Sequence, residues 1–189
     1  MRLCLIRHLP PDVPPGVCYG QTDLALKDPA SAVADALPVL RTQLAAMLPE
    51  GAPVFASPLQ RCLTLANALS SNVIEEPRLR ELNFGSWEMR AWDEIGPEAL
   101  DAWAANIAGF RPPGGETGDE LQARALDWLR ESSQQHGYAI VITHAGVMRA
   151  LQAHHQQLPG ADWLRLRYDY GQLLCLDFTL EQIHASPVQ

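Results

Sequence analysis

Basic side chains follow three short apolar segments of this chain. Arg7 and His8 follow the first segment, Arg61 the second and His144 the last long one. An apolar strand has no packing reason to end in arginine and histidine, so the pattern predicts that these side chains bind an anion. Two arginines can hold the oxygens of a phosphate through paired hydrogen bonds. A neutral imidazole can attack phosphorus, and a second, protonated imidazole would stabilise the charge that develops during transfer.

Cleavage of a phosphate ester also needs a proton for the departing alkoxide. Two carboxylates, Glu81 and Glu88, lie in the irregular segment 79–88. Either is a candidate general acid if burial or the charge of the phosphate raises its pKa. The basic residues are accompanied neither by a lysine-bearing phosphate loop nor by an aspartate pair for Mg²⁺. We therefore predict a reaction that uses no metal and no cofactor.

Short apolar segments alternate with stretches of helical periodicity, which predicts one α/β domain over residues 1–189 with a mostly parallel sheet. In such sheets ligands bind beyond the carboxyl ends of the strands, so we expect the basic residues to converge on one crevice. The predicted strands span 3–6, 53–56, 73–74, 138–142, 164–168 and 173–178, with the last two at an antiparallel edge. The predicted helices span 31–48, 59–69, 91–105, 117–129 and 146–155.

The composition restricts the class of partner. Among 189 residues, 14 are basic and 22 acidic, and a net charge of −8 would on average repel nucleic acid and anionic membranes. No apolar run approaches the ~18 residues of a membrane span, so we expect a cytoplasmic protein. We predict a small phosphorylated molecule as the partner and leave a homodimer open.

Four cysteines, Cys4, Cys18, Cys62 and Cys175, are spread along the chain without a C-x-x-C spacing. Their positions suggest neither a zinc site nor a redox pair. Because Cys4, Cys62 and Cys175 lie in apolar runs, we interpret these three as small buried hydrophobic residues.

Four motifs occur in order along the chain, three of them at the ends of predicted strands. They read LIRH at 5–8, SxLxR at 57–61, LxExxFGxWE at 79–88 and THAG at 143–146. Together they resemble the signatures of the histidine phosphatase superfamily, in its phosphoglycerate-mutase-like branch. The resemblance implies a three-layer α/β/α sandwich and a phosphohistidine intermediate. It also implies that His8 is the nucleophile, that Glu81 is the acid, and that Arg7, Arg61 and His144 form the phosphate pocket.

Two further segments narrow the resemblance. CYGQTDLAL at 18–26, and PGGET at 113–117 before a helix, look like the corresponding segments of α-ribazole phosphatases. Those enzymes remove the 5′-phosphate from a precursor of the lower ligand of cobalamin, so the resemblance implies α-ribazole 5′-phosphate or a similar substrate. Gln21 and Thr22 lie in the first segment and are candidate phosphate contacts, although a plain turn explains them equally well.

The chain departs from the family pattern directly after the nucleophile. Leu9 follows His8 where the family usually has glycine, and it would alter the backbone beside the phosphate. Besides a phosphatase, two alternatives remain: a phosphoglycerate mutase, and a catalytically weak protein that binds a phosphorylated ligand. The mutases are longer and richer in basic residues, whereas Lys27 is the only lysine here, so the hydrolase is favoured. We leave open whether the pocket is shaped by Glu116 or by one of Trp87, Trp92 and Trp103.

Overall fold

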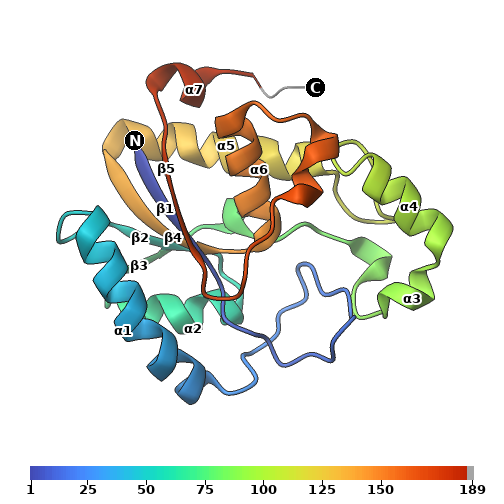
Figure 1. The fold of residues 1–189 in the computed structure, drawn as a ribbon, viewed down its shortest axis with the longest axis horizontal. Helices are drawn as coiled ribbons and strands as arrows, with labels where there is room; N and C mark the ends of the chain where they lie inside the picture. Colours follow the sequence, from blue (N-terminus) through green and yellow to red (C-terminus); the bar gives the residue numbers. More distant parts are fainter. Residues whose placement is uncertain (187–189) are drawn as a thin grey trace.

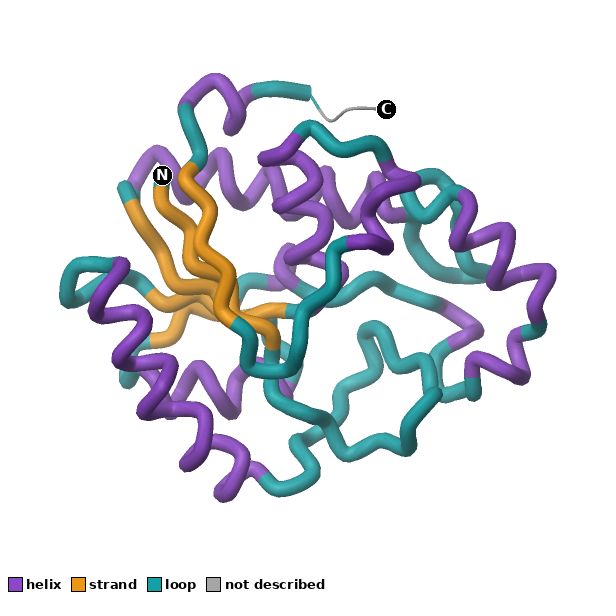
Figure 2. Tube along the Cα trace, in the orientation of Figure 1, coloured by secondary structure: helices purple, strands orange, loops and turns teal. Residues whose placement is uncertain are grey.

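The computed structural model describes residues 1–186, which form a five-stranded sheet with helices on both faces (Figure 1). The strands are β1 Arg2–Arg7, β2 Val54–Ala56, β3 Val73–Glu75, β4 Tyr138–Thr143 and β5 Leu173–Asp177. Their order in the sheet is β3-β2-β4-β1-β5. The first four are parallel, and β5 runs antiparallel to β1 at the edge of the sheet, whose strands are orange in Figure 2.

Long helices connect the parallel strands, and shorter ones follow β3 and precede and follow β5. The predicted helix over 91–105 is two helices, because Gly96 has a φ of 94° and Pro97 follows it. The α-helices are α1 Pro29–Met47, α2 Gln60–Leu69, α3 Trp92–Ile95, α4 Pro97–Ala105, α5 Gly118–Gln135, α6 Ala145–Gln156 and α7 Leu180–His184. The 3₁₀ helices are η1 Pro77–Leu79, η2 Gly85–Trp87 and η3 Gly160–Arg165.

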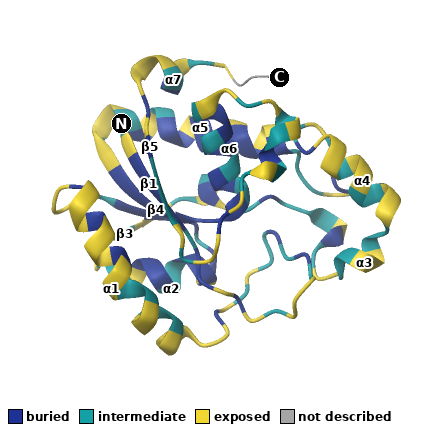
Figure 3. Cartoon of the chain, viewed as in Figure 1, coloured by how far each residue is buried: buried dark blue, intermediate teal, exposed yellow. Residues whose placement is uncertain are grey.

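Two hydrophobic clusters lie on opposite faces of the sheet, because successive side chains of a strand point to opposite faces. In β1, Leu3 and Leu5 belong to one cluster, whereas Cys4 and Ile6 belong to the other. Helices α5 and α6 contribute to the first cluster, and α1 and α2 to the second. Figure 3 shows these helices with buried residues toward the sheet and exposed residues on the outside. The predicted three-layer α/β/α sandwich with an antiparallel edge is confirmed.

The strand predicted over 164–168 is wrong. The chain there leaves η3 and continues to β5 outside the sheet. Leu164, Leu166 and Tyr168 alternate with arginines because all three pack against the first cluster. Alternation shows which side of an extended segment is buried, but a strand also needs a neighbour for its backbone hydrogen bonds.

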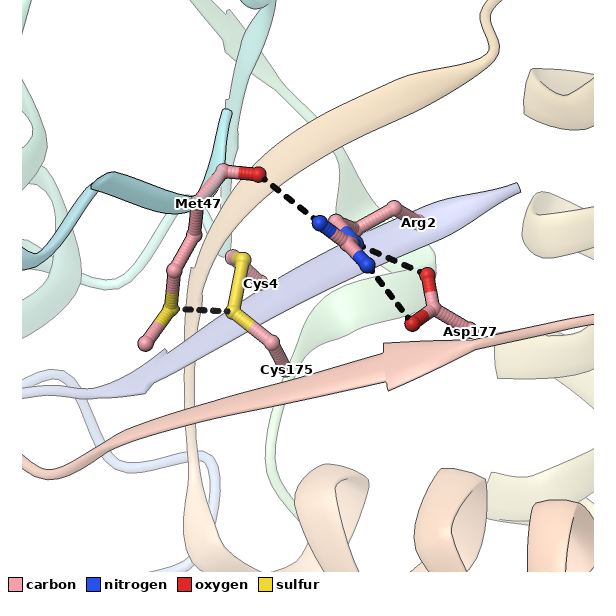
Figure 4. Close-up of a disulfide and its surroundings, with 5 residues drawn as sticks. All are labelled: Arg2, Cys4, Met47, Cys175 and Asp177. Atoms are coloured by element: carbon pink, nitrogen blue, oxygen red, sulfur yellow. Dashed lines mark hydrogen bonds and ion pairs between the residues drawn. A yellow bond between two sulfur atoms is a disulfide. The ribbon is translucent and has the colours of Figure 1, made fainter. Parts of the chain in front are cut away.

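Cys4 and Cys175 form a disulfide, so the interpretation of these two as unbonded hydrophobic residues is wrong (Figure 4). They lie opposite each other on β1 and β5, with Cα atoms 4.2 Å apart. The contact arises from strand pairing across a sequence separation of 171, which spacing rules do not detect. On the same strand pair, Arg2 forms an ion pair with Asp177 at 2.8 Å. Cys62 is free and buried, as predicted.

No helix in the part of the chain that the structure describes is long and apolar enough to cross a membrane. The cytoplasmic location stays a prediction. The Cys4–Cys175 disulfide counts against it, because disulfides are uncommon in reducing compartments. The homodimer likewise stays a prediction.

Candidate active site

Strand pairing brings the two predicted histidines together. Arg7 pairs with Thr143 in the parallel register of β1 and β4, so His8 and His144 leave the sheet side by side. The amide of His8 donates to the carbonyl of Thr143 at 2.9 Å, and the two imidazole centroids are 5.1 Å apart. Arg61 comes from the first turn of α2, directly after β2. His8 is 1% exposed, and Arg61 and His144 are 0% exposed.

A single contact defines the tautomer of His8. Its Nδ1 lies 2.7 Å from the carbonyl oxygen of Leu9, and because a carbonyl oxygen only accepts, Nδ1 carries the proton. Nε2 therefore keeps its lone pair. Burial, and after it the positive charge of Arg61, lowers the pKa of His8 to about 3. The ring is thus neutral near pH 7, which an attacking nitrogen requires.

Leu9 accepts the hydrogen bond of the His8 ring through its backbone carbonyl. Its side chain is 4% exposed and packs in the second cluster with Leu26 and Leu40. The carbonyl oxygen that orients His8 is a backbone atom, and a residue of any type could supply it. The departure from the family's usual glycine therefore leaves the hydrogen bond to His8 in place.

Two arginines extend toward the histidines, and each is held by backbone carbonyls. Arg61 donates to the carbonyls of Thr22 at 2.8 Å and Gly20 at 2.6 Å, and Arg7 donates to that of Tyr168 at 2.7 Å. The Nε atoms of Arg7 and Arg61 are both buried without a hydrogen-bond partner. Within residues 1–186, neither arginine forms an ion pair with a carboxylate. Their positive charges therefore remain available to an anion.

The ring of His144 is held by a hydroxyl. Its Nε2 lies 2.8 Å from Oγ of Ser57, the first residue after β2. Burial, followed by the charge of Arg61, holds the pKa of His144 well below its usual range. The free protein therefore has a neutral His144, whereas the sequence argument required a protonated ring. The dianionic charge of a phosphate acts in the opposite direction and favours protonation.

The two candidate carboxylates have different surroundings. Glu81 accepts hydrogen bonds from the amides of Leu82 at 2.9 Å and Gly146 at 3.1 Å, and it lines a cavity. A Cβ on Gly146 would lie 2.0 Å from a carboxylate oxygen of Glu81, so a larger residue there would displace the carboxylate from this position. Glu88 instead accepts from the amides of Gln21 at 2.9 Å, Thr22 at 2.6 Å and Phe84 at 3.1 Å. Of the two, the geometry favours Glu81 as the acid.

Gln21 and Thr22 take part in a network beside the pocket and do not line the cavity. The side-chain Nε2 of Gln21 donates to the carbonyl of Glu81 at 3.0 Å, and the Thr22 hydroxyl donates to Glu88. Glu116 joins the same network, accepting from Gln21 at 3.3 Å and pairing with Arg124 at 2.6 Å. These side chains hold the segment that carries Glu81 against the segment whose carbonyls, at Gly20 and Thr22, bind Arg61. A direct contact of Gln21 or Thr22 with phosphate stays a prediction.

A cavity of about 640 Å³ opens next to Arg7 and Glu81. One wall is aromatic, since Phe84, Trp92 and Trp103 line it and pack together, with the two tryptophans stacked at 5.9 Å. Trp87 does not line it. Of the residues left open from the sequence, Trp92 in α3 and Trp103 in α4 line the cavity, whereas Glu116 does not.

Four residues at this cavity were not singled out as site residues from the sequence: Tyr19, Tyr170, Lys27 and Arg149. Arg149 follows Gly146 by three positions on α6, a spacing that places both on one helix face. That spacing could have identified Arg149 as a site residue from the sequence. For Tyr170 there was none, because it lies in a turn before β5 whose position depends on the fold. Among the described residues, no cluster of three or more histidine, cysteine or acidic side chains is placed to bind a metal.

The sequence pattern of the whole chain agrees with this geometry. A family model described as "Histidine phosphatase superfamily (branch 1)" matches residues 3–186. The chain belongs to the histidine phosphatase superfamily.

Known proteins match this chain over different shares of its length. A metal-independent phosphoserine phosphatase from Arabidopsis thaliana is 32% identical over 109 aligned positions, and the match covers 52% of this chain and 46% of that protein. This chain therefore spans less than half the length of that relative. Among solved structures, a mycobacterial glucosyl-3-phosphoglycerate phosphatase matches with a TM-score of 0.78 and 26% identity, covering 92% of this chain and 88% of its own. Bacillus stearothermophilus YhfR matches with a TM-score of 0.80 and 26% identity, covering 92% and 89%.

Membership of the histidine phosphatase superfamily, with phosphatases among its relatives, supports an enzyme that hydrolyses phosphate esters. The narrower resemblance to α-ribazole phosphatases is not confirmed by these comparisons. The named relatives act on different phosphoesters, so the family does not define a substrate.

Proposed function

We propose that this protein is a metal-independent phosphomonoesterase that works through a phosphohistidine at His8. The observation that carries the proposal is the hydrogen bond from His8 Nδ1 to the Leu9 carbonyl, which leaves Nε2 with a lone pair inside the pocket. Arg7 and Arg61 supply charge and unpartnered donors around it. The name phosphate pocket is used for Arg7, His8, Arg61 and His144 together.

The first step transfers the phosphoryl group to the protein. His8 Nε2 attacks phosphorus, a P–N bond forms and the bond from phosphorus to the ester oxygen breaks. The leaving alkoxide takes a proton from the carboxyl group of Glu81, which lines the cavity where the alcohol lies. Arg7, Arg61 and His144 stabilise the charge on the equatorial oxygens.

The second step returns the protein to its starting state. Glu81, now a carboxylate, accepts a proton from water while the water oxygen attacks phosphorus. The P–N bond breaks, inorganic phosphate forms and the electron pair returns to Nε2 of His8. Because Nδ1 stays hydrogen-bonded to the Leu9 carbonyl, the ring keeps one orientation through both steps.

For the substrate, we propose α-ribazole 5′-phosphate or a similar small phosphoester. The aromatic wall of Phe84, Trp92 and Trp103 supports an alcohol with an apolar or aromatic body, because such rings pack against one another. The segment at 18–26 that resembles α-ribazole phosphatases contributes Tyr19 and Gly20 to the same cavity.

Phosphate release in excess EDTA tests the proposal. The substrates are α-ribazole 5′-phosphate, 3-phosphoglycerate, sugar phosphates, nucleotides and p-nitrophenyl phosphate, and His8→Ala is the blank. We expect the wild type to release phosphate and to yield an acid-labile phosphohistidine, and His8→Ala to do neither while keeping its fold. Activity retained by His8→Ala would overturn the mechanism. Broad, slow release would keep the mechanism and reject the substrate, and phosphoryl return to phosphoglycerate would favour a mutase.

A further inference from the structure

We propose that Tyr19 and Tyr170 are positioning residues for phosphoryl transfer, which together hold the two arginines of the phosphate pocket around the phosphate. This inference rests on the proposed function, because it concerns the same site. We call the two side chains the tyrosine pair.

Each ring of the tyrosine pair lies near one arginine. The Tyr170 ring centroid is 3.8 Å from Cζ of Arg7, and the Tyr19 ring centroid is 5.2 Å from Cζ of Arg61. Both distances fall within the range of a cation–π interaction. A flat ring over a guanidinium group restricts the plane of that group, and the plane decides where its hydrogen-bond donors point.

The two tyrosines are joined to each other above the nucleophile. Their hydroxyl oxygens lie 3.0 Å apart, although the residues are separated by 151 positions in the chain. The centroid of the His8 ring is 5.5 Å from that of Tyr170 and 6.5 Å from that of Tyr19. The pair therefore spans the site from one arginine to the other, with His8 beneath it.

Burial shows which groups the pair separates. Tyr19, Tyr170 and Arg7 line the cavity, whereas His8 and Arg61 are almost fully buried and do not. The tyrosine pair thus lies at the boundary between the cavity and the buried part of the pocket. Rings at this boundary keep water away from Arg61, which strengthens its attraction for a phosphate.

The backbone aims Tyr170 at Arg7. The amide of Gly171, which has a φ of 72°, donates to the carbonyl of Arg7 at 3.0 Å, and the amide of Gln172 donates to that of Asp169 at 3.1 Å. Tyr170 therefore sits in a tight turn fastened to the end of β1. It is 40% exposed and belongs to neither hydrophobic cluster, so core packing does not explain its position.

The test compares ring removal with hydroxyl removal at Tyr170. Tyr170→Leu removes the ring and Tyr170→Phe keeps it, while Tyr138→Leu is a matched control, since Tyr138 is 37% exposed at the opposite end of β4. The readouts are the inhibition constant of inorganic phosphate, KM and kcat with p-nitrophenyl phosphate, and the melting temperature. We expect Tyr170→Leu to raise the inhibition constant and KM together by about 3- to 30-fold, the range of a cation–π interaction. We expect Tyr170→Phe to stay within about threefold of wild type, because it loses one neutral hydrogen bond.

A double-mutant cycle tests the link between the two rings. Tyr19→Phe and Tyr170→Phe remove the same hydrogen bond, so the double variant should bind phosphate no more weakly than either single variant. Independent, multiplicative effects would show that the hydroxyls do not act as one unit and would overturn the joint role of the tyrosine pair.

The remaining outcomes separate this inference from the proposed function. If the wild type forms phosphohistidine and binds phosphate, but Tyr170→Leu behaves as Tyr138→Leu does, the positioning role is wrong and the mechanism stands. If Tyr170→Leu lowers the melting temperature without changing phosphate binding, the residue is structural only. A wild type that neither forms phosphohistidine nor binds phosphate overturns both proposals.

Discussion

The two ends of the site are built in different ways. The phosphate pocket consists of polar side chains at the ends of β1, β2 and β4, almost all of them buried and held by backbone carbonyls or a hydroxyl. The cavity beyond Glu81 is walled by aromatic residues from irregular segments and short helices. A pocket on rigid strand ends suits a phosphoryl group that every substrate shares, whereas loops and short helices suit the part of the substrate that varies.

The phosphate pocket and the cavity can therefore be tested separately. Changes in the phosphate pocket should reduce turnover of every phosphoester by a similar factor. Changes in the cavity should depend on the alcohol that leaves.

Glu81→Gln should have the largest effect that depends on the leaving group. Glutamine keeps the size of the side chain and one acceptor oxygen for the backbone amides that Glu81 binds, those of Leu82 and Gly146, but it has no acidic proton to give. Turnover of alkyl phosphates should fall by about 10²- to 10⁴-fold, and that of p-nitrophenyl phosphate far less, because its leaving group needs little protonation. The measurement is kcat on both substrates, and equal losses would reject Glu81 as the acid.

Glu88→Gln is the matched control for that experiment. Glu88 accepts backbone hydrogen bonds from Gln21, Thr22 and Phe84, so its loss should lower the free energy of unfolding by about 1–3 kcal/mol. The ratio of alkyl to aryl turnover should stay that of the wild type. A changed ratio would mean that the two glutamates share the proton transfer.

Arg61→Gln should affect all substrates alike. Arg61 is fully buried in the phosphate pocket, and removing one such donor typically costs about 10²- to 10³-fold in kcat. The same factor should appear with alkyl and aryl phosphates, with folding checked by thermal unfolding. Arg165→Gln is the control, because that side chain is 82% exposed. A loss that varied with the alcohol would contradict the division of the site into two ends.

The convergence of Arg7, His8, Arg61 and His144 could be predicted from the sequence, whereas the lining of the cavity could not, for a physical reason. Arg7, His8 and His144 directly follow apolar strands, and parallel pairing brings such positions together in any fold of this class. The cavity depends on side chains from segments that no local pattern connects. Tyr19 and Tyr170 meet across 151 residues, as Cys4 and Cys175 do across 171.

The same reason explains the errors in secondary structure. Local apolar periodicity identified the buried faces of the sheet and of its main helices. It could not distinguish a strand over 164–168 from the end of a 3₁₀ helix followed by unpaired chain, because a strand is defined by its hydrogen bonds to a neighbouring strand.

The two histidines of the phosphate pocket should contribute to the pH dependence of stability, together with His154, whose pKa burial also lowers. The folded protein holds the pKa of His8 at about 3 and that of His144 well below its usual range, whereas both titrate near 6.5 when unfolded. Below that pH the unfolded chain binds more protons, so the free energy of unfolding should fall as the pH falls from about 6.5 toward 3. Each histidine contributes a slope of about 1.4 kcal/mol per pH unit, measurable by urea unfolding at several pH values. His8→Asn should remove one such contribution, and an unchanged slope would contradict burial of a neutral His8.

Trp103→Leu should have the smallest effect, confined to the cavity. Trp103 stacks on Trp92 and contacts the edge of Phe84, so its loss removes part of the aromatic wall without touching the phosphate pocket. The KM for an aromatic ester such as phenyl phosphate should rise by about 2- to 12-fold, the range of an aromatic contact, while the KM for glycerol phosphate changes little. The inhibition constant of inorganic phosphate serves as the internal control, since that ligand has no alcohol portion. If phosphate inhibition weakened as much as the KM for phenyl phosphate rose, the aromatic wall would be part of the phosphate pocket, and the two ends of the site would act as one.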